Sequence, residues 1–481
     1  MRIKCFFSSF LIAVLILFGS MTFIVNAASN EEGVAENVVV DVNENNYKIG
    51  DVNLDGTVDS LDFALMKMYL QGAVDLFPSE SKPTVRLDDV NFDNEFDSLD
   101  LATMKKYLLG MITCFEPDSS LFEFKIKTSA ANEVYKFPIK NVTTATNVVV
   151  LWGDGTISKV ANYSNRSHNY STIGTYSIKV ISFSQMPISF YNDENLVEVV
   201  KPIPDINATD FNDCFCGCIN LVSIPAGLFE NNVNVTSFGG CFQYCTKLTS
   251  IPKELFNKNV KATDFNNCFY RCGSLVSITE GLFDYNIDAT NFAFCFNYCS
   301  KLTTIPAGLF RNNVNARNFN GCFLGCYKLT TIPEGLFDTN VNVDNFRGCF
   351  AACEPLTQIP AGLFDKNVNV TDFSGCFNDC KQLREIPTDL FNKNVKVTTF
   401  ESCFAGCKSI VQIPTGLFDN NLCVNDFSGC FSGCENMTGT APALWLRATM
   451  PIGSSCFLAC TKLSNYEDIP IDWKVIEGHI D

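Results

Sequence analysis

Residues 238–256 read FGGCFQYCTKLTSIPKELF, and variants of this stretch follow one another along more than half of the 481-residue chain. Each copy places two cysteines four residues apart, and the first cysteines of neighbouring copies are 27 residues apart until the last step of 26. A fixed period of this size predicts a solenoid, because one copy is too short to bury its own apolar face. The ten pairs are Cys214/Cys218, Cys241/Cys245, Cys268/Cys272, Cys295/Cys299, Cys322/Cys326, Cys349/Cys353, Cys376/Cys380, Cys403/Cys407, Cys430/Cys434 and Cys456/Cys460.

The quoted copy predicts one α-helix and one short strand. Its apolar residues from Phe238 to Cys245 stand at positions i, i+3, i+4 and i+7, which share one face of an α-helix. Leu248 and Ile251 suit a short strand that Pro252 ends. We therefore expect an α/β solenoid in which each copy stacks on the next.

The paired cysteines leave three roles open. Both Cβ atoms of a pair on one helix lean the same way, which strains a bridge within the pair, and a bridge between copies needs Cα atoms closer than about 7 Å. Zinc needs four converging ligands, for which ten equivalent helices offer no natural pairing. We expect mostly free, buried packing thiols, with disulfides or a metal site as the alternatives. Free thiols in an exported chain imply an anaerobic setting. Cys114, Cys216 and Cys423 lie outside the pairs.

From about Ile203 to Asp481 the copies resemble the BspA-like leucine-rich repeats of bacterial surface proteins. The resemblance implies a secreted or surface protein whose repeats serve adhesion or protein binding, and it supplies no catalytic residues. The last copy is irregular, as expected of a terminal cap. We assign residues 203–481 to this solenoid.

The N-terminus is typical of an exported chain. Arg2 and Lys4 precede an apolar run and the small-residue pattern of residues 25–27, which predicts a signal peptide over 1–27. A polar linker follows over residues 28–46, and no later stretch is apolar enough to span a bilayer. The formal net charge of −17, with no basic patch apparent in the sequence, argues against nucleic-acid binding.

Two acidic loops follow the linker. Residues 51–62 place carboxylate or amide oxygens at loop positions one, three, five, nine and twelve, with Gly56 at position six. Calcium takes six to eight oxygen ligands, which this spacing supplies. The pattern recurs over residues 89–100, where Asn94 replaces the glycine. Two calcium ions are therefore expected. The ligands are Asp51, Asn53, Asp55, Thr57, Asp59 and Asp62 in the first loop, and Asp89, Asn91, Asp93, Glu95, Asp97 and Asp100 in the second.

Each loop is followed by one amphipathic helix, over residues 63–70 and 101–109, and no helix pattern precedes it. Two such half EF-hands resemble the type I dockerin of cellulosomes, which are assemblies for polysaccharide degradation, and we assign residues 47–114 to this module. The resemblance implies that calcium folds the module and that it docks onto a cohesin domain of a scaffoldin. It also implies that either copy can face the cohesin, through Ser60, Leu61, Lys67, Met68, Ser98, Leu99, Lys105 and Lys106.

Residues 119–200 alternate apolar and polar residues in short runs, which predicts an antiparallel β-sandwich. The stretches WGDGT (152–156), HNY (168–170) and GTY (174–176) resemble the PKD-type fold, in which this set is structural. Asp154 and His168 could be imagined as a catalytic pair, but Asp-Gly is a hairpin signal and no nucleophile is in register.

The sequence therefore predicts a multidomain α+β protein that is non-catalytic and secreted. We expect the dockerin to attach it to a cellulosome, and the repeats to bind a protein or mediate adhesion. One alternative is a cellulosomal hydrolase, which needs two carboxylates across a cleft, whereas Asp264 and Asp372 fall at predicted helix starts. The other is a carbohydrate-binding solenoid, which needs a row of exposed aromatic residues. Only Tyr244, Tyr270 and Tyr298 leave the core pattern, so no such row is expected.

Overall fold

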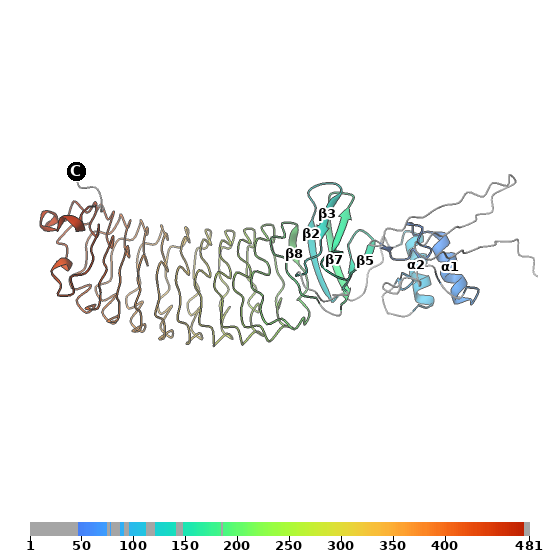
Figure 1. Cartoon of the computed structure of the whole chain (residues 1–481), viewed down its shortest axis with the longest axis horizontal. Coiled ribbons are helices and arrows are strands. Elements are labelled where there is room, and N and C mark those ends of the chain that lie inside the picture. The colour runs from blue at the N-terminus through green and yellow to red at the C-terminus, as the bar shows by residue number, and fades with distance from the viewer. Residues whose placement is uncertain are drawn as a thin grey trace, which may run out of the picture. The chain divides into compact units, whose positions relative to one another are not determined.

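The computed structural model describes residues 47–74, 77, 87–90, 96–111, 121–140, 148–183 and 186–475. They belong to two compact units, Met1–Ser119 with Asp154–Lys159, and Ser120–Gly153 with Val160–Asp481. The predicted signal peptide and linker lie outside the described residues. Figure 1 labels helices and strands of both units.

The first unit contains helix α1, Ser60–Leu70, and helix α2, Ser98–Leu108. Each begins three residues before the start predicted from its apolar pattern. In α1 the Asp59 side chain accepts a hydrogen bond from the N–H of Leu61 at 2.7 Å, while Asp62 accepts one from the N–H of Asp59 at 2.9 Å. This reciprocal cap starts the helix inside the acidic loop.

The two helices bury equivalent residues. Met66 of α1 and Met104 of α2 are both fully buried, and the helices contact each other. Strand β1 (Tyr47–Lys48) pairs antiparallel with β5 (Thr156–Val160) in the same unit. The duplication in sequence is therefore also a duplication in structure.

The second unit begins with two antiparallel sheets. Strands β4, β7, β2 and β8 lie side by side in that order, and β3 pairs with β6. Phe122, Phe124 and Ile126 of β2 are buried while the residues between them are not, as their alternation predicts. The bounds are β2 Phe122–Lys127, β3 Glu133–Lys136, β4 Val148–Leu151, β6 Ser167–Tyr170, β7 Thr175–Ser182 and β8 Leu196–Val199.

The WGDGT, HNY and GTY stretches contribute to one aromatic stack. The ring of Trp152 lies parallel to that of His168 with centroids 4.5 Å apart, and Tyr170 packs edge-on against His168 at 4.5 Å. The Tyr170 hydroxyl donates to the Trp152 carbonyl at 2.8 Å. All three side chains are buried, so they build the core beside these sheets.

The repeats contain no α-helix in the part of the chain that the structure describes, so the helix predicted from Phe238 to Cys245 is wrong. The segment instead forms two consecutive tight turns. The N–H of Cys241 donates to the carbonyl of Phe238 at 3.1 Å, and the N–H of Cys245 donates to that of Phe242 at 3.1 Å. Each turn is four residues long, which is also the spacing of the cysteines.

The third residue of each turn has a positive φ, 62° at Gly240 and 61° at Tyr244. A turn with this one positive φ and a hydrogen bond from residue i+3 to residue i is a type II turn. The residue before every paired cysteine has a positive φ, so the same tandem turn recurs in every copy. An α-helix needs negative φ throughout, which excludes it here.

Neighbouring copies are joined by main-chain hydrogen bonds. The N–H groups of Phe238, Gly240 and Phe242 donate to the carbonyls 26 residues further on, at 2.8 to 2.9 Å. The main-chain ladder of parallel bridges passes through Ser237 and its equivalents, just before the tandem turns. The strand predicted from Leu248 to Ile251 does not form. The stacked solenoid is confirmed, but its secondary structure differs from the prediction.

Three columns of phenylalanine rings run through the solenoid, beginning with Phe211, Phe215 and Phe229. Neighbouring rings lie nearly parallel, as for Phe242 and Phe269, whose centroids are 5.5 Å apart at an interplanar angle of 3°. The rings are fully buried. Because each ring contacts its equivalents in the copies before and after it, the core is continuous along the repeats.

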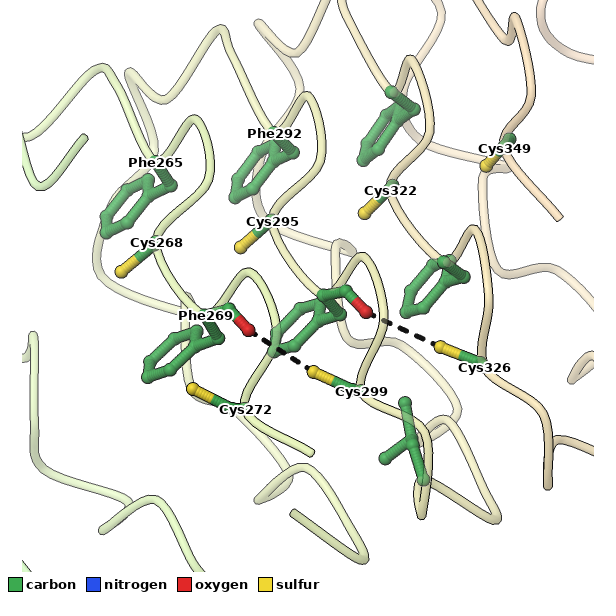
Figure 2. Close-up of a cluster of buried hydrophobic side chains, with 14 of the residues drawn as sticks. Phe265, Cys268, Phe269, Cys272, Phe292, Cys295, Cys299, Cys322, Cys326 and Cys349 are labelled. Carbon is green, nitrogen blue, oxygen red and sulfur yellow. Dashed lines mark hydrogen bonds between the residues drawn. The ribbon is translucent and has the colours of Figure 1, made fainter. Parts of the chain in front are cut away.

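The paired cysteines lie among these rings as buried free thiols, as expected from their apolar pattern. Figure 2 shows Cys268 and Cys295 in one column and Cys299 in another. The Cys299 thiol donates to the carbonyl of Phe269 in the preceding copy at 3.3 Å (Figure 2). Burial raises the pKa of such thiols, to about 12 for Cys353. The cysteines therefore serve as packing groups and as donors between copies.

One buried asparagine in each of eight copies joins the copies through its side chain. The Asn259 amide nitrogen donates to the carbonyl of Asn232 at 2.9 Å and to that of Phe229 at 3.2 Å. These bonds pair main-chain carbonyls that would otherwise be buried alone. The column consists of Asn232, Asn259, Asn286, Asn313, Asn340, Asn367, Asn394 and Asn421.

Both ends of the phenylalanine columns are covered by aromatic residues from outside the regular copies. Phe190, from the β-rich segment, stacks on Phe215 at 5.1 Å. Trp473, in the short 3-10 helix Ile471–Trp473, lies over Phe457 at 6.3 Å. Two further 3-10 helices, Leu444–Leu446 and Tyr466–Asp468, belong to the irregular last copy.

Candidate calcium loops and docking surface

The first acidic loop is folded around two buried carboxylates. Asp51 accepts hydrogen bonds from the N–H groups of Asp55 at 3.1 Å and Gly56 at 2.9 Å. Asp62 accepts them from Asn53 at 3.2 Å and from Asp59 at 2.9 Å. The first and last predicted ligands of the loop are therefore held in place by its own main chain.

When no cation is near, burial disfavours the charged form of these carboxylates. Burial, with smaller contributions from the carboxylates of Asp51 and Asp55, raises the pKa of Asp62 to about 7. Burial also raises the pKa of Asp51 to about 6, again with a contribution from Asp55. Asp55 thus raises the pKa of both buried carboxylates, and carboxylate oxygens are hard donors of the kind that calcium prefers.

The other predicted ligands of this loop make local bonds. Asp59 caps α1 through the N–H of Leu61, and the hydroxyl of Thr57 donates to Asp55 at 2.7 Å. The amide of Asn53 donates to Asp55 at 2.8 Å. Within the described residues, no three His, Cys, Asp or Glu side chains are arranged as a ready metal site. The two calcium ions remain a prediction from ligand type and spacing.

The second loop repeats the end of the first. Asp100 accepts a hydrogen bond from the N–H of Asp97 at 2.9 Å, and Asp97 accepts one from that of Leu99 at 2.6 Å. Asp100 and Asp89 are both buried. The remaining predicted ligands, Asn91, Asp93 and Glu95, lie outside the described residues.

The eight predicted docking residues lie on α1 and α2 and are all exposed. Leu61 and Leu99 occupy equivalent positions in the first turns of the two helices, with 61% and 59% of their surface exposed. Large apolar side chains exposed at two related positions suit a partner surface. The two helices differ at the pair Met68 and Lys106, as their sequences already show.

The repeats present a second candidate surface, which the sequence reasoning missed. Tyr244, Tyr270 and Tyr298 form a contiguous row with Tyr327, with neighbouring ring centroids 5.4 to 6.3 Å apart. Arg271 lies over the first three rings. The expectation that no aromatic row exists is therefore wrong for these four copies.

His168 and Asp154, the pair that the sequence suggests for catalysis, both make structural contacts. His168 is buried between Trp152 and Tyr170. The Asp154 carboxylate accepts hydrogen bonds from the N–H of Thr156 at 3.0 Å and from its hydroxyl at 2.6 Å. Each residue is therefore engaged by its own turn or stack.

Comparison with known proteins confirms the resemblance of the N-terminal module. Residues 49–109 match the family model described as the dockerin type I domain. None of the curated proteins compared with the chain is similar to it. No helix among the described residues is long and apolar enough to cross a membrane.

Three solved structures illustrate the similarities. A type I cohesin–dockerin complex from Clostridium thermocellum is 42% identical over 14% of this chain and 90% of that chain, with a TM-score of 0.13. A complex of a scaffoldin cohesin and the Cel5 dockerin from Acetivibrio cellulolyticus is 46% identical over 14% of this chain and 100% of that one, with a TM-score of 0.14. A leucine-rich cell surface protein from Faecalibacterium prausnitzii is 20% identical over 58% of this chain and 82% of that one, with a TM-score of 0.29.

Proposed function

We propose that this protein is a non-catalytic, secreted component of a cellulosome. Its dockerin segment docks onto a cohesin domain of a scaffoldin in a calcium-dependent way, and the attached solenoid binds another protein or mediates adhesion. The observation that carries the proposal is the dockerin match over residues 49–109, together with Leu61 and Leu99 exposed at equivalent positions of two related helices.

Calcium is part of the proposal because the first loop buries the carboxylates of Asp51 and Asp62, and burial raises the pKa of both. Asp51, Asp55 and Asp62 would hold the ion, with oxygens from Asn53 and Thr57 completing the shell. The bound ion would offset the repulsion and burial that raise the pKa of Asp51 and Asp62. It would thereby fix the start of α1, on which Ser60 and Leu61 lie.

The non-catalytic role is supported by the environment of the reactive residue types. A catalytic cysteine has a lowered pKa and is accessible, whereas burial raises the pKa of the paired thiols. His168 stacks between aromatic rings, and Asp154 holds a turn. These contacts favour structural roles for the residues that a hydrolase would need.

The test is binding of the full chain to a panel of type I cohesins, by isothermal titration calorimetry with calcium and with EGTA. We expect tight binding to at least one cohesin with calcium and none with EGTA. Absence of binding to every cohesin in the panel would contradict the docking function.

The duplicated surface sharpens this test. Replacing Ser60 and Leu61 by aspartate should weaken cohesin binding by less than about threefold, because α2 presents an equivalent surface. Changing Ser98 and Leu99 in the same chain should abolish binding. Loss of binding from the α1 change alone would show that only one helix docks.

A further inference from the structure

The row of tyrosines on the repeats is the centre of a distinct surface. We call Tyr244, Tyr270, Arg271, Tyr298 and Tyr327 the tyrosine face. The Arg271 guanidinium lies 5.3, 5.5 and 5.1 Å from the ring centroids of Tyr244, Tyr270 and Tyr298. Arg271 is exposed, and 36% of the surface of Tyr327 is exposed. The face thus offers a cation held among aromatic rings at the surface.

The tyrosine face is locally basic in a strongly acidic protein. The four segments 239–248, 266–275, 293–302 and 320–329 contain no Asp or Glu, although the whole chain has a net charge of −17. They contain four cations, and none of these forms an ion pair within the part of the chain that the structure describes. These cations are Lys247, Arg271, Lys301 and Lys328.

Further along the solenoid, the cations that stand one position before the equivalents of these lysines are neutralised. Lys381 pairs with Glu354 at 2.7 Å, and Lys408 pairs with Glu435 at 2.8 Å. The equivalent segments of those copies also lack tyrosine. Among the equivalent segments of the described repeats, tyrosine and a cation without an ion pair therefore occur together in the four consecutive copies from Cys241 to Cys326.

The turns under the tyrosine face hold bulky residues in the left-handed region of φ. Tyr244, Arg271 and Tyr298 have φ values of 61°, 59° and 55° at a turn position where the other copies have glycine, alanine or aspartate. A bulky residue in the left-handed region is unfavourable and points to a role other than stability. At Gly325 a β-carbon would lie 2.8 Å from the ring of Tyr298, so this glycine leaves room for the ring.

The chemistry of the face favours a protein partner over a sugar chain. Tyrosine and arginine are the residues that dominate binding energy at protein interfaces. A row of sugars would need rings that share one plane, but the rings of Tyr270 and Tyr298 are inclined at 79° and those of Tyr298 and Tyr327 at 63°. Arg271 also covers part of the Tyr270 ring, against which a sugar would have to stack.

We propose that the tyrosine face binds an acidic segment of a partner protein that carries at least one aromatic side chain. Carboxylates of the segment pair with Arg271 and the three lysines, and its aromatic side chain packs against the tyrosine rings. This rests on the proposed protein-binding role of the solenoid and names its surface and the chemistry of its partner.

The experiment uses the full chain on an array of synthetic 15-residue peptides of three designed compositions: acidic with aromatic residues, basic with aromatic residues, and neutral. We expect preferential binding to the acidic aromatic peptides, weakening as salt is raised. Arg271→Glu and, separately, Tyr270→Ala with Tyr298→Ala should weaken this binding by about tenfold or more. Lys408→Glu, with the same change in net charge on a neutralised copy, should leave it unchanged.

The outcomes separate this proposal from the function it rests on. If acidic peptides bind but Arg271→Glu has no effect, the tyrosine face is not their site, although the solenoid still binds proteins. If no peptide class is preferred, protein binding by the repeats fails too, while cohesin binding of the same sample tests the dockerin independently. If polygalacturonate binds and loses binding in Arg271→Glu, the partner is a glycan and the proposal is overturned. Unchanged circular dichroism of each variant excludes misfolding.

Discussion

The dockerin segment and the solenoid are both built by repeating a short sequence, yet they bury opposite kinds of side chain. The first loop of the dockerin segment buries Asp51 and Asp62, and burial raises the pKa of both carboxylates. The solenoid buries phenylalanine, free cysteine and asparagine, and pairs the asparagines with the preceding copy. The difference predicts that the first structure depends on an ion from outside, whereas each copy of the second depends on its neighbour.

Removal of calcium should produce the largest difference between the dockerin segment and the solenoid. EGTA should unfold α1 and α2, because the carboxylates around Asp62 then repel one another in a core too small to compensate. The repeats should be unaffected. Hydrogen exchange of the full chain, followed by mass spectrometry, should show complete loss of protection over residues 60–70 and 98–108 and none over 211–437.

Unchanged protection of both helices in EGTA would show that the loops need no ion. A control with calcium added back should restore the protection. Magnesium, which demands a smaller octahedral site, should restore it poorly.

The asparagine column should show the dependence of one copy on another. Asn340 donates to the carbonyls of Phe310 at 3.0 Å and Asn313 at 2.9 Å in the preceding copy. Asn340→Ala should lower the free energy of unfolding by about 2 to 4 kcal/mol, because two buried carbonyls lose their donor. Urea denaturation of the solenoid, followed by circular dichroism, measures this loss.

Asn342→Ala is the matched control, two residues away in the same copy. Its amide donates to the carbonyl of Val314 at 3.1 Å but is exposed, so water can replace it and the cost should stay below about 0.5 kcal/mol. Equal losses of unfolding free energy from the two changes would mean that the buried asparagine column contributes no more to stability than an exposed asparagine.

The smallest expected effect is that of Gly375→Ala, and its sign distinguishes a turn from a helix at this position. Gly375 has a φ of 59°, and a β-carbon there would meet no atom closer than 3.8 Å. Gly375→Ala should therefore destabilise the solenoid by about 1 kcal/mol through backbone strain alone. In a helix the same change would stabilise by about 1 kcal/mol. The shift of the urea midpoint gives the sign.

Ala352→Gly provides the reverse experiment. Ala352 occupies the third position of the second tandem turn in the preceding copy, with a φ of 56°. Glycine should relieve the strain there and raise the midpoint, whereas a helix would be weakened by the same change.

Sequence reasoning succeeded where spacing alone carries the chemistry. The oxygens at fixed loop positions identified the dockerin segment, and the 27-residue period identified the stack. Period was not enough to identify secondary structure, because tandem four-residue turns place Phe238 and Cys241 much as a 3.6-residue helix would. The missed signal was glycine before cysteine, as at Gly240 and Gly375, where a helix former would be expected.

The tyrosine face was missed for a different reason. Tyr270 stands one position before the column that contains Tyr244 and Tyr298, and Tyr327 stands two positions after it. Only the stacking of the copies brings these offset residues together, so no pattern within one copy shows the row. The net charge of the whole chain likewise concealed four segments without a single carboxylate.

The forward hydrogen bonds of the tandem turns give the solenoid a direction, much as a filament has two unlike ends. At one end, the carbonyls of Cys214 and Cys216 accept hydrogen bonds from Phe190 and Asn192 of the β-rich segment. At the other, the N–H of Phe457 donates to the carbonyl of Trp473. These two covers are different because one supplies donors and the other supplies an acceptor. A chain stripped of both would carry complementary ends that favour head-to-tail association, so the covers also oppose this kind of association.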